Sequence, residues 1–120
     1  MEVPILKQGD FLIATVQAAL TDADLLHLRA ALLQQVVRCR SQGVIVDVTS
    51  LDVMDSFASR TLREIAQMIH LRGAETVIVG IQPEVAFAMV QLGIKLEDVA
   101  TALDLEEGLA HLKQKSESPT

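Results

Sequence analysis

Apolar and polar residues follow one another in blocks that predict strands alternating with helices. The turn sequence Gln8-Gly9-Asp10 separates the first two apolar segments and favours an antiparallel hairpin. Two later runs are rich in valine and isoleucine, which is typical of strands buried on both faces of a parallel sheet. The expected strands share this apolar composition and lie at 5–7, 11–16, 44–48, 76–79 and 98–100.

Leucine, isoleucine and valine spaced three and four apart predict the helices between these strands. The first helix is expected to begin after the N-cap Thr21 and to end at Gly43. The second is expected to begin at Asp55 or Ser56 and to end at 72–73. The residues expected on their buried faces are Leu25, Leu28, Leu32, Val36 and Cys39 in the first helix, and Leu62, Ile65, Met68 and Ile69 in the second.

Two further helices are expected in the second half of the chain. Pro83 fits the first turn of a helix that runs to Leu92. Its residues 85–90 are more apolar than one buried stripe requires, so either the helix is buried on most sides or it contacts another subunit. Asp104 then caps a last helix, with Glu107 at the capping-box position and with Leu105, Leu109 and Leu112 facing inward.

This order of elements predicts one α/β domain over residues 1–115, followed by a flexible tail at 116–120. Strands that alternate with helices form a mostly parallel sheet, and the N-terminal hairpin makes that sheet mixed. A chain of 120 residues, half of them hydrophobic, is large enough for one core of this kind.

Charge and composition argue against several classes of function. The net charge of -6 and the absence of tryptophan and tyrosine disfavour nucleic-acid binding. No signal peptide and no membrane span are expected, which favours a cytoplasmic protein. Cys39 stands alone in an apolar helix and is expected to be a buried, inert thiol. The three histidines fall in three different helices, so no metal site or cofactor site is expected.

The densest polar segment, residues 47–57, follows the strand at 44–48. Ser56 is expected in the first turn of the second helix, where free backbone N–H groups and the helix dipole favour an anion. A phosphate on Ser56 would gain hydrogen bonds there, although Asp52 and Asp55 would repel it. The residues alone allow a second interpretation, in which Asp55 and Ser56 only cap the helix.

The run 44–57 reads strand–Asp–x–Thr-Ser–x–Asp–x–x–Asp-Ser-Phe, which resembles the signature of STAS domains. Similarity extends through 4–7, 80–86, 92–94 and 101–109, and together these segments closely resemble RsbS-type antagonists of the bacterial stressosome. The resemblance implies the STAS fold and a scaffold protein that is not itself an enzyme. It also implies homo-oligomeric and hetero-oligomeric assembly with RsbR-type STAS proteins.

The resemblance further implies a phosphorylation switch at Ser56. An RsbT-type serine kinase is held by the unphosphorylated protein, phosphorylates this serine and is then released, and an RsbX-type phosphatase reverses the modification. Asp55 would help to present the hydroxyl. The surface that contacts the kinase is expected to contain Asp52, Asp55, Ser56, Phe57 and Ser59.

Position 57 departs from the pattern of classical anti-sigma-factor antagonists. These continue Asp-Ser-Ser-Gly, whereas this chain has Phe57 and Ala58 after Asp55-Ser56. Ser59, one helical turn after Ser56 and expected on a similar face, is therefore a second candidate acceptor. The hydroxyls of Thr49 and Ser50 rank behind both as loop positions.

Three other classes of function fit the sequence less well. A purely structural STAS subunit without a phosphoryl cycle remains the alternative. A serine hydrolase is disfavoured because the sequence has no G-x-S-x-G elbow and no histidine placed to activate Ser56. A response-regulator receiver, suggested by Asp47 near a strand end, lacks the acidic pair and the lysine that such a site needs.

Overall fold

The computed structural model describes residues 3–17, 20–96 and 99–117. Its centre is a five-stranded sheet in which β1 pairs antiparallel with β2 and all other neighbours are parallel. This confirms the predicted α/β fold with a mixed, mostly parallel sheet. In sheet order the strands are β1 (Ile5–Gln8), β2 (Phe11–Thr15), β3 (Gly43–Asp47), β4 (Glu75–Val79) and β5 (Ala100–Ala102).

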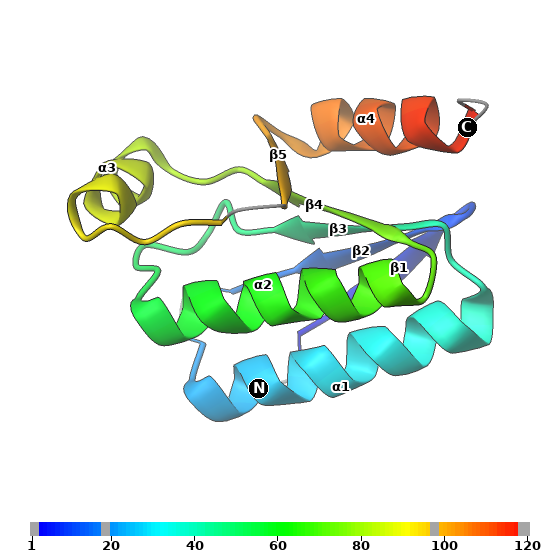
Figure 1. The fold of residues 1–120 in the computed structure, drawn as a ribbon, viewed down its shortest axis with the longest axis horizontal. Helices are drawn as coiled ribbons and strands as arrows, with labels where there is room; N and C mark the ends of the chain where they lie inside the picture. Colours follow the sequence, from blue (N-terminus) through cyan, green and yellow to red (C-terminus); the bar gives the residue numbers. More distant parts are fainter. Residues whose placement is uncertain (1–2, 18–19, 97–98, 118–120) are drawn as a thin grey trace.

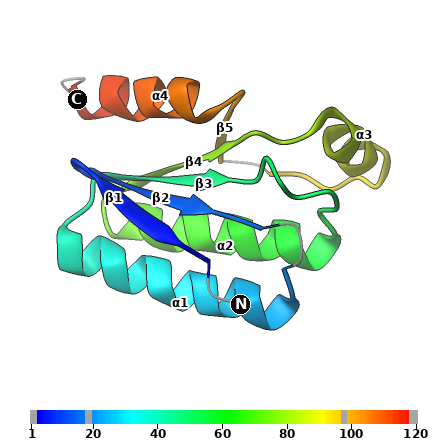
Figure 2. The same ribbon diagram turned by 180° about the vertical axis from the view of Figure 1, so that it is seen from behind.

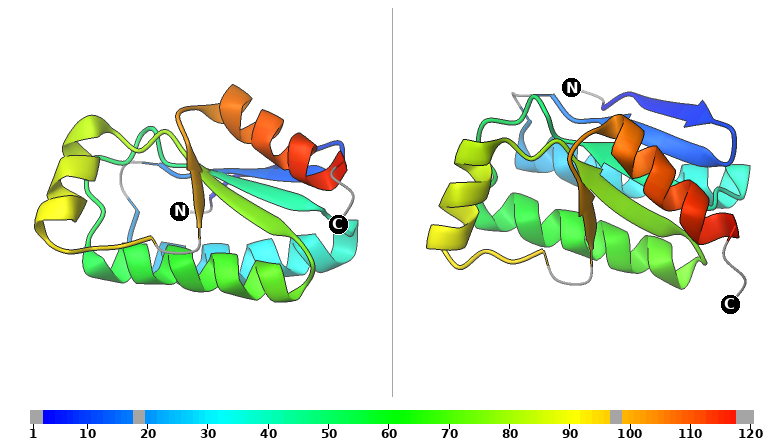
Figure 3. Two further views of the ribbon diagram at one scale, coloured as in Figure 1. Left: turned by 45° about the horizontal axis from the view of Figure 1, so that its top comes forward. Right: turned by 90° about the horizontal axis from the view of Figure 1, so that it is seen from above.

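The helices form layers on the two faces of the sheet. Two long helices, α1 (Asp22–Cys39) and α2 (Ser56–Leu71), lie side by side on one face (Figure 1). The opposite face is covered by α4 (Leu105–Glu117), as the view from behind also shows (Figure 2). The short helix α3 (Pro83–Gln91) stands beyond the carboxyl ends of the strands (Figure 3). The loop between β3 and α2 lies at this same end.

Alternate residues of the central strands fill two separate cores, as the two-residue period of a strand requires. Val44, Val46 and Ile78 point toward α1 and α2. Ile45 and Val77 point to the other face and pack with Leu112 of α4. All five strand residues are almost completely buried, so the prediction that the apolar runs are buried on both faces is confirmed.

Helix α1 begins as predicted but ends earlier. Thr21 caps it through a capping box with Asp24, with backbone-to-side-chain hydrogen bonds of 3.0 and 3.1 Å. Its C-cap is Arg40, in a left-handed conformation with φ of 50°, and the expectation that Gly43 ends the helix is wrong. Gly43 begins β3, where a Cβ atom would lie 2.8 Å from Cδ2 of Leu112. Close packing of α4, rather than a helix end, accounts for this glycine.

Two residues differ in burial from the prediction, and one strand differs in position. Cys39 is half-buried rather than buried, and its thiol lies 3.6 Å from the Gln35 side-chain oxygen. Met68 is exposed, because it lies at the edge of the α2 stripe that faces the sheet. The fifth strand begins at Ala100, two residues later than expected, and residue 98 lies outside the described residues.

The last helix also confirms part of the prediction. Asp104 accepts a hydrogen bond of 2.9 Å from the backbone N–H of Glu107, as an N-cap does. Leu112 is fully buried, while Leu105 and Leu109 are half-buried against the same core. The helix includes residues 116 and 117, which were expected in the tail, and residues 118–120 lie outside the described residues.

Candidate functional site

The loop that follows β3 is fixed to the neighbouring strand and to the core. The N–H of Val48 donates to the carbonyl of Val79 over 3.0 Å, which extends the β3–β4 ladder by one residue. Leu51 and Met54 then turn inward and are buried in the larger core. Two apolar anchors thus hold the loop whose remaining side chains face solvent.

Polar contacts complete the anchoring of this loop. Asp47 accepts hydrogen bonds from both the backbone N–H and the hydroxyl of Thr49, at 2.9 and 2.6 Å. Gln82, which follows β4, donates through Nε2 to the carbonyl of Thr49 at 2.7 Å and to Oδ1 of Asp52 at 3.3 Å. The Thr49 hydroxyl is therefore engaged. The bridging role of Gln82 was not predicted, because its partners lie some thirty positions earlier in the chain.

Gly80 permits the close approach of these two loops. Its φ of 80° lies in the left-handed region that L residues rarely adopt. A Cβ atom at this position would also overlap the hydroxyl of Thr49. Glycine here is required both by backbone conformation and by lack of space.

Asp55 is the N-cap of α2 and Ser56 is the first residue of the helix. The carboxylate of Asp55 accepts a hydrogen bond of 2.7 Å from the N–H of Ala58. Its carbonyl accepts one of 3.0 Å from the N–H of Ser59. The predicted start of the helix and the capping role of Asp55 are thus confirmed. Ser56 stands in the first turn, where the dipole of the helix is positive.

The predicted site residues divide into exposed and buried ones. Asp52, Asp55 and Ser56 are exposed, and Phe57 is half-buried against the core. Ser59 is only 3% exposed, and its hydroxyl has no hydrogen-bond partner in the described part of the chain. Ser59 lines the same cleft as Ser56, as its spacing of three residues predicts, but its hydroxyl is buried, which disfavours it as an acceptor. The structure brings four of the five predicted residues to the surface.

Basic side chains that the sequence analysis missed lie beside Ser56. Arg60 and Arg63 of α2, together with Lys95 after α3, line a cleft that also contains Ser56 and Ser59. The spacing of four and seven residues from Ser56 was a usable signal for the two arginines, since such positions share one face of a helix. Lys95 comes close only through the fold. None of the described residues that line this cleft is a histidine.

The short helix α3 is less buried than expected. Val85 and Met89 pack into the core, whereas Phe87 is 65% and Val90 78% exposed. Leu92, just after the helix, is also exposed. The expectation of a helix buried on most sides is wrong, because α3 stands off the end of the sheet and one side of it meets no other element.

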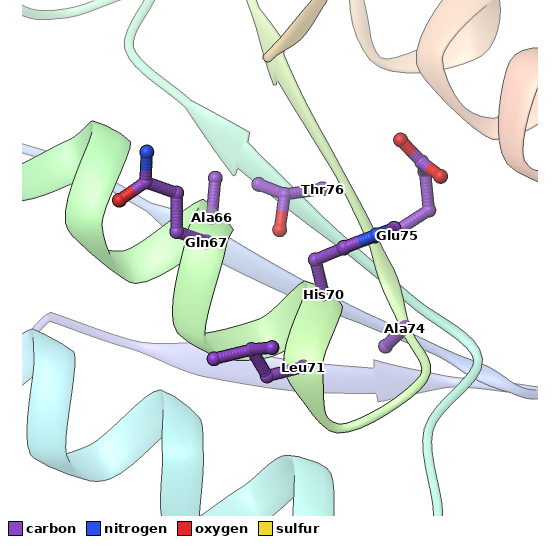
Figure 4. Close-up of a pocket in the computed structure, with 7 residues that line it drawn as sticks. All are labelled: Ala66, Gln67, His70, Leu71, Ala74, Glu75 and Thr76. Atoms are coloured by element: carbon purple, nitrogen blue, oxygen red, sulfur yellow. The ribbon is translucent and has the colours of Figure 1, made fainter. Parts of the chain in front are cut away.

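A larger hollow lies at the other end of α2 and contains none of the predicted site residues. It measures about 630 Å³ and is formed between the last turns of α2 and the beginning of β4 (Figure 4). It is open because β5 pairs only with Val77–Val79 and leaves Glu75 and Thr76 without a neighbouring strand on that side. The hydroxyl of Thr76 is buried there without a partner among the described residues.

Within the described ranges, no group of three histidine, cysteine, aspartate or glutamate side chains could hold a metal ion. None of the described helices is long and apolar enough to cross a membrane.

Comparisons with known proteins agree with this architecture. The solved structure of Moorella thermoacetica RsbS carrying one serine-to-glutamate substitution has a TM-score of 0.84 and 32% identity, covering 98% of this chain and 100% of that one. A chain from a structure described as the molecular architecture of the stressosome, a signal integration and transduction hub, has a TM-score of 0.81 and 34% identity, covering 96% of this chain and 100% of that one.

Sequence comparison adds a relative of greater length. The RsbT co-antagonist protein RsbRA of Bacillus subtilis is 37% identical over 78 residues, which are 65% of this chain but only 28% of RsbRA. The chain therefore spans less than a third of the length of this relative. The model of the family described as STAS domain matches residues 2–108. This chain is a member of the STAS domain family, and it is similar to RsbS.

Proposed function

We propose that this chain is a phosphorylation-switched antagonist in a cytoplasmic stressosome-type complex. The unphosphorylated form holds an RsbT-type serine kinase, and phosphorylation of Ser56 releases that kinase to activate its downstream target. An RsbX-type phosphatase restores the first state. RsbR-type STAS proteins are the partners with which the chain assembles, and the chain itself is a substrate rather than an enzyme.

One observation carries this proposal: Ser56 is exposed in the first turn of α2, at the end of a loop held by hydrogen bonds and buried anchors. A kinase can reach the hydroxyl without unfolding the helix. We expect the kinase to supply the base that takes the hydroxyl proton, since none of the described residues that line the cleft at Ser56 is a histidine. Transfer of the γ-phosphoryl group of ATP to Oγ then leaves ADP and a phosphoserine.

The surroundings of Ser56 support a switch that works by charge. A phosphate adds about -1.5 to -2 charges beside the exposed carboxylates of Asp52 and Asp55. A kinase surface that accepts the neutral serine next to these two carboxylates would meet a much more negative surface after the reaction. Phosphorylation is therefore expected to weaken the complex through repulsion and desolvation cost.

The first experiment locates the phosphate. The chain is incubated with an RsbT-type kinase and ATP, and its intact mass is measured before the modified residue is mapped. We expect one phosphoryl group, lost in Ser56→Ala and retained in Ser59→Ala, because Ser59 is buried. Ser50→Ala is the matched control, since Ser50 is an exposed loop hydroxyl. Labelling that survives Ser56→Ala and disappears in Ser59→Ala would contradict the assignment.

A second experiment tests the release step. Kinase retention on immobilised wild type, Ser56→Ala and Ser56→Asp is compared in a pull-down. We expect Ser56→Ala to retain the kinase and Ser56→Asp to retain less, although one carboxylate supplies only part of the charge of a phosphate. Equal retention by all three proteins, together with normal assembly, would favour the alternative of a purely structural STAS subunit.

A further inference from the structure

A cleft of about 260 Å³ opens beside Ser56, between the first half of α2 and the segment that follows α3. Its wall on the α2 side consists of Ser56, Ser59, Arg60 and Arg63, and its other wall is the segment 92–95. The volume is several times the roughly 30 Å³ that one water molecule occupies in the liquid, so a phosphate-sized group has room to enter.

The α2 wall is one continuous stripe of the helix. Positions three, four and seven residues after Ser56 lie on the same face, so Ser59, Arg60 and Arg63 all follow it toward the carboxyl end. Arg60 is exposed and Arg63 is half-buried. Within the described residues neither guanidinium has an ion pair, whereas Arg29 is paired with Glu64 at 3.3 Å. Two uncompensated positive charges thus line the cleft next to the serine.

A buried hydroxyl marks the same wall. The Oγ atom of Ser59 is removed from solvent and has no hydrogen-bond partner in the described structure. Buried polar groups in folded proteins are nearly always paired, so an unpaired one calls for an explanation. Because Ser59 lines the same cleft as the two arginines, its hydroxyl can donate to an anion that enters there.

Asp52 and Asp55 are not among the described residues that line the cleft. The Asp55 carboxylate is engaged with the N–H of Ala58, and Asp52 is held by Gln82 in the preceding loop. A phosphate on Ser56 would be repelled from this loop and attracted toward the arginine stripe. Lys95 lies on the opposite wall of the cleft.

From these observations we propose that the cleft is an intramolecular receptor for the phosphate on Ser56, with Arg60 and Arg63 as its main ligands. The inference rests on the proposed function in one respect only, namely that Ser56 is the residue modified. The guanidinium groups offer planar pairs of N–H donors that match two phosphate oxygens, and the Ser59 hydroxyl donates to a third. With these contacts the phosphate lies along α2. They hold the surface around phosphorylated Ser56 in one fixed conformation.

The test does not require a kinase, so that its failure and that of the proposed function can be told apart. Phosphoserine is incorporated at position 56 by genetic encoding, and its second ionisation is followed by phosphorus NMR during a pH titration. The dianion is the form that the two arginines stabilise, so the pKa of the phosphoserine should fall about one unit below its usual value near 6. In the double variant Arg60→Gln/Arg63→Gln the pKa should return toward 6.

A second double variant, Arg38→Gln/Arg72→Gln, is the matched control. It removes the same total charge, but Arg72 follows the last residue of α2, about 24 Å along the helix from Ser56. The control should leave the lowered pKa in place, and Ser59→Ala should raise it by a smaller amount than the arginine double variant. An unshifted pKa in the otherwise unsubstituted phosphoprotein, or an equal change in both double variants, would overturn the proposal. Failure of the kinase to label Ser56 would instead overturn the proposed function.

Discussion

The two ends of helix α2 differ in polarity and in how their surroundings hold the backbone. Its N-terminal end is polar, capped by Asp55 and attached to a loop that Gln82 ties to the neighbouring strand end. Its C-terminal end borders the hollow beside β4 and exposes Leu71, whose side chain is 84% accessible (Figure 4). One end has a fixed backbone with accessible charge, and the other has an open sheet edge with accessible apolar surface.

This difference has consequences for where a phosphate can act. At the N-terminal end, free backbone N–H groups and two arginines favour an added negative charge. At the C-terminal end, the helix dipole is negative and an added phosphate would be unfavourable. The position of Ser56 at the first residue of the helix is therefore the position at which α2 best tolerates modification.

The largest expected effect is a difference in stability between substitutions at two glycines. Gly80 packs against Thr49 of the loop before α2, and Gly73 follows the C-terminal end of the helix. Gly80→Ala should destabilise the protein by about 2–4 kcal/mol, because it adds left-handed strain to a clash with Thr49. Gly73→Ala, after the C-terminal end, has a similar φ of 85° but open space around its Cβ position, so it should cost only about 1–2 kcal/mol. Urea unfolding of both variants measures the difference. Equal losses of unfolding free energy would mean that the two ends tolerate an added Cβ atom equally well.

A smaller effect is expected from the cap of α2. Asp55→Ala removes the acceptor of the Ala58 N–H and should cost about 1 kcal/mol, whereas Asp52→Ala, on the same loop, should stay within about 0.5 kcal/mol. The amide of Ala58 should also exchange faster with solvent in Asp55→Ala. Asp55→Ser, which keeps a capping oxygen, should recover most of both losses. Fast exchange in Asp55→Ser as well would show that capping is not what protects this amide.

The periodic parts of the fold could be predicted from sequence. The runs 44–48 and 76–79 are apolar and β-branched throughout, and they form strands buried on both faces. Thr21 and Asp104 were identified as caps because capping depends on residues three positions apart. Such local patterns determine local structure directly.

Features that depend on distant residues could not be predicted. Gly43 resembled a helix end in sequence, but its role is to accommodate Leu112 of α4. The burial of Ser59 depends on which way α2 faces the sheet, and that rotation is set by packing. Likewise, α3 has an apolar sequence, yet nothing in that sequence shows that Phe87 would be left exposed beyond the end of the sheet. These are consequences of how the layers meet.

The smallest effect concerns two buried hydroxyls, one near each end of α2. Ser59 and Thr76 both lack a hydrogen-bond partner among the described residues. Because an unpaired buried hydroxyl is itself unfavourable, Ser59→Ala and Thr76→Val should leave the unmodified protein equally stable or up to about 1 kcal/mol more stable. Urea unfolding of the unmodified variants measures this.

Once Ser56 carries phosphate, the variants Ser59→Ala and Thr76→Val should differ in their effect. Only Ser59→Ala should then alter the phosphoserine titration, since Thr76 lies in the other hollow. A loss of stability above about 1 kcal/mol in either unmodified variant would mean that its hydroxyl has a partner after all. A change in the titration caused by Thr76→Val would mean that the two ends are coupled through the helix. With neither result, the N-terminal cleft acts as a separate anion site.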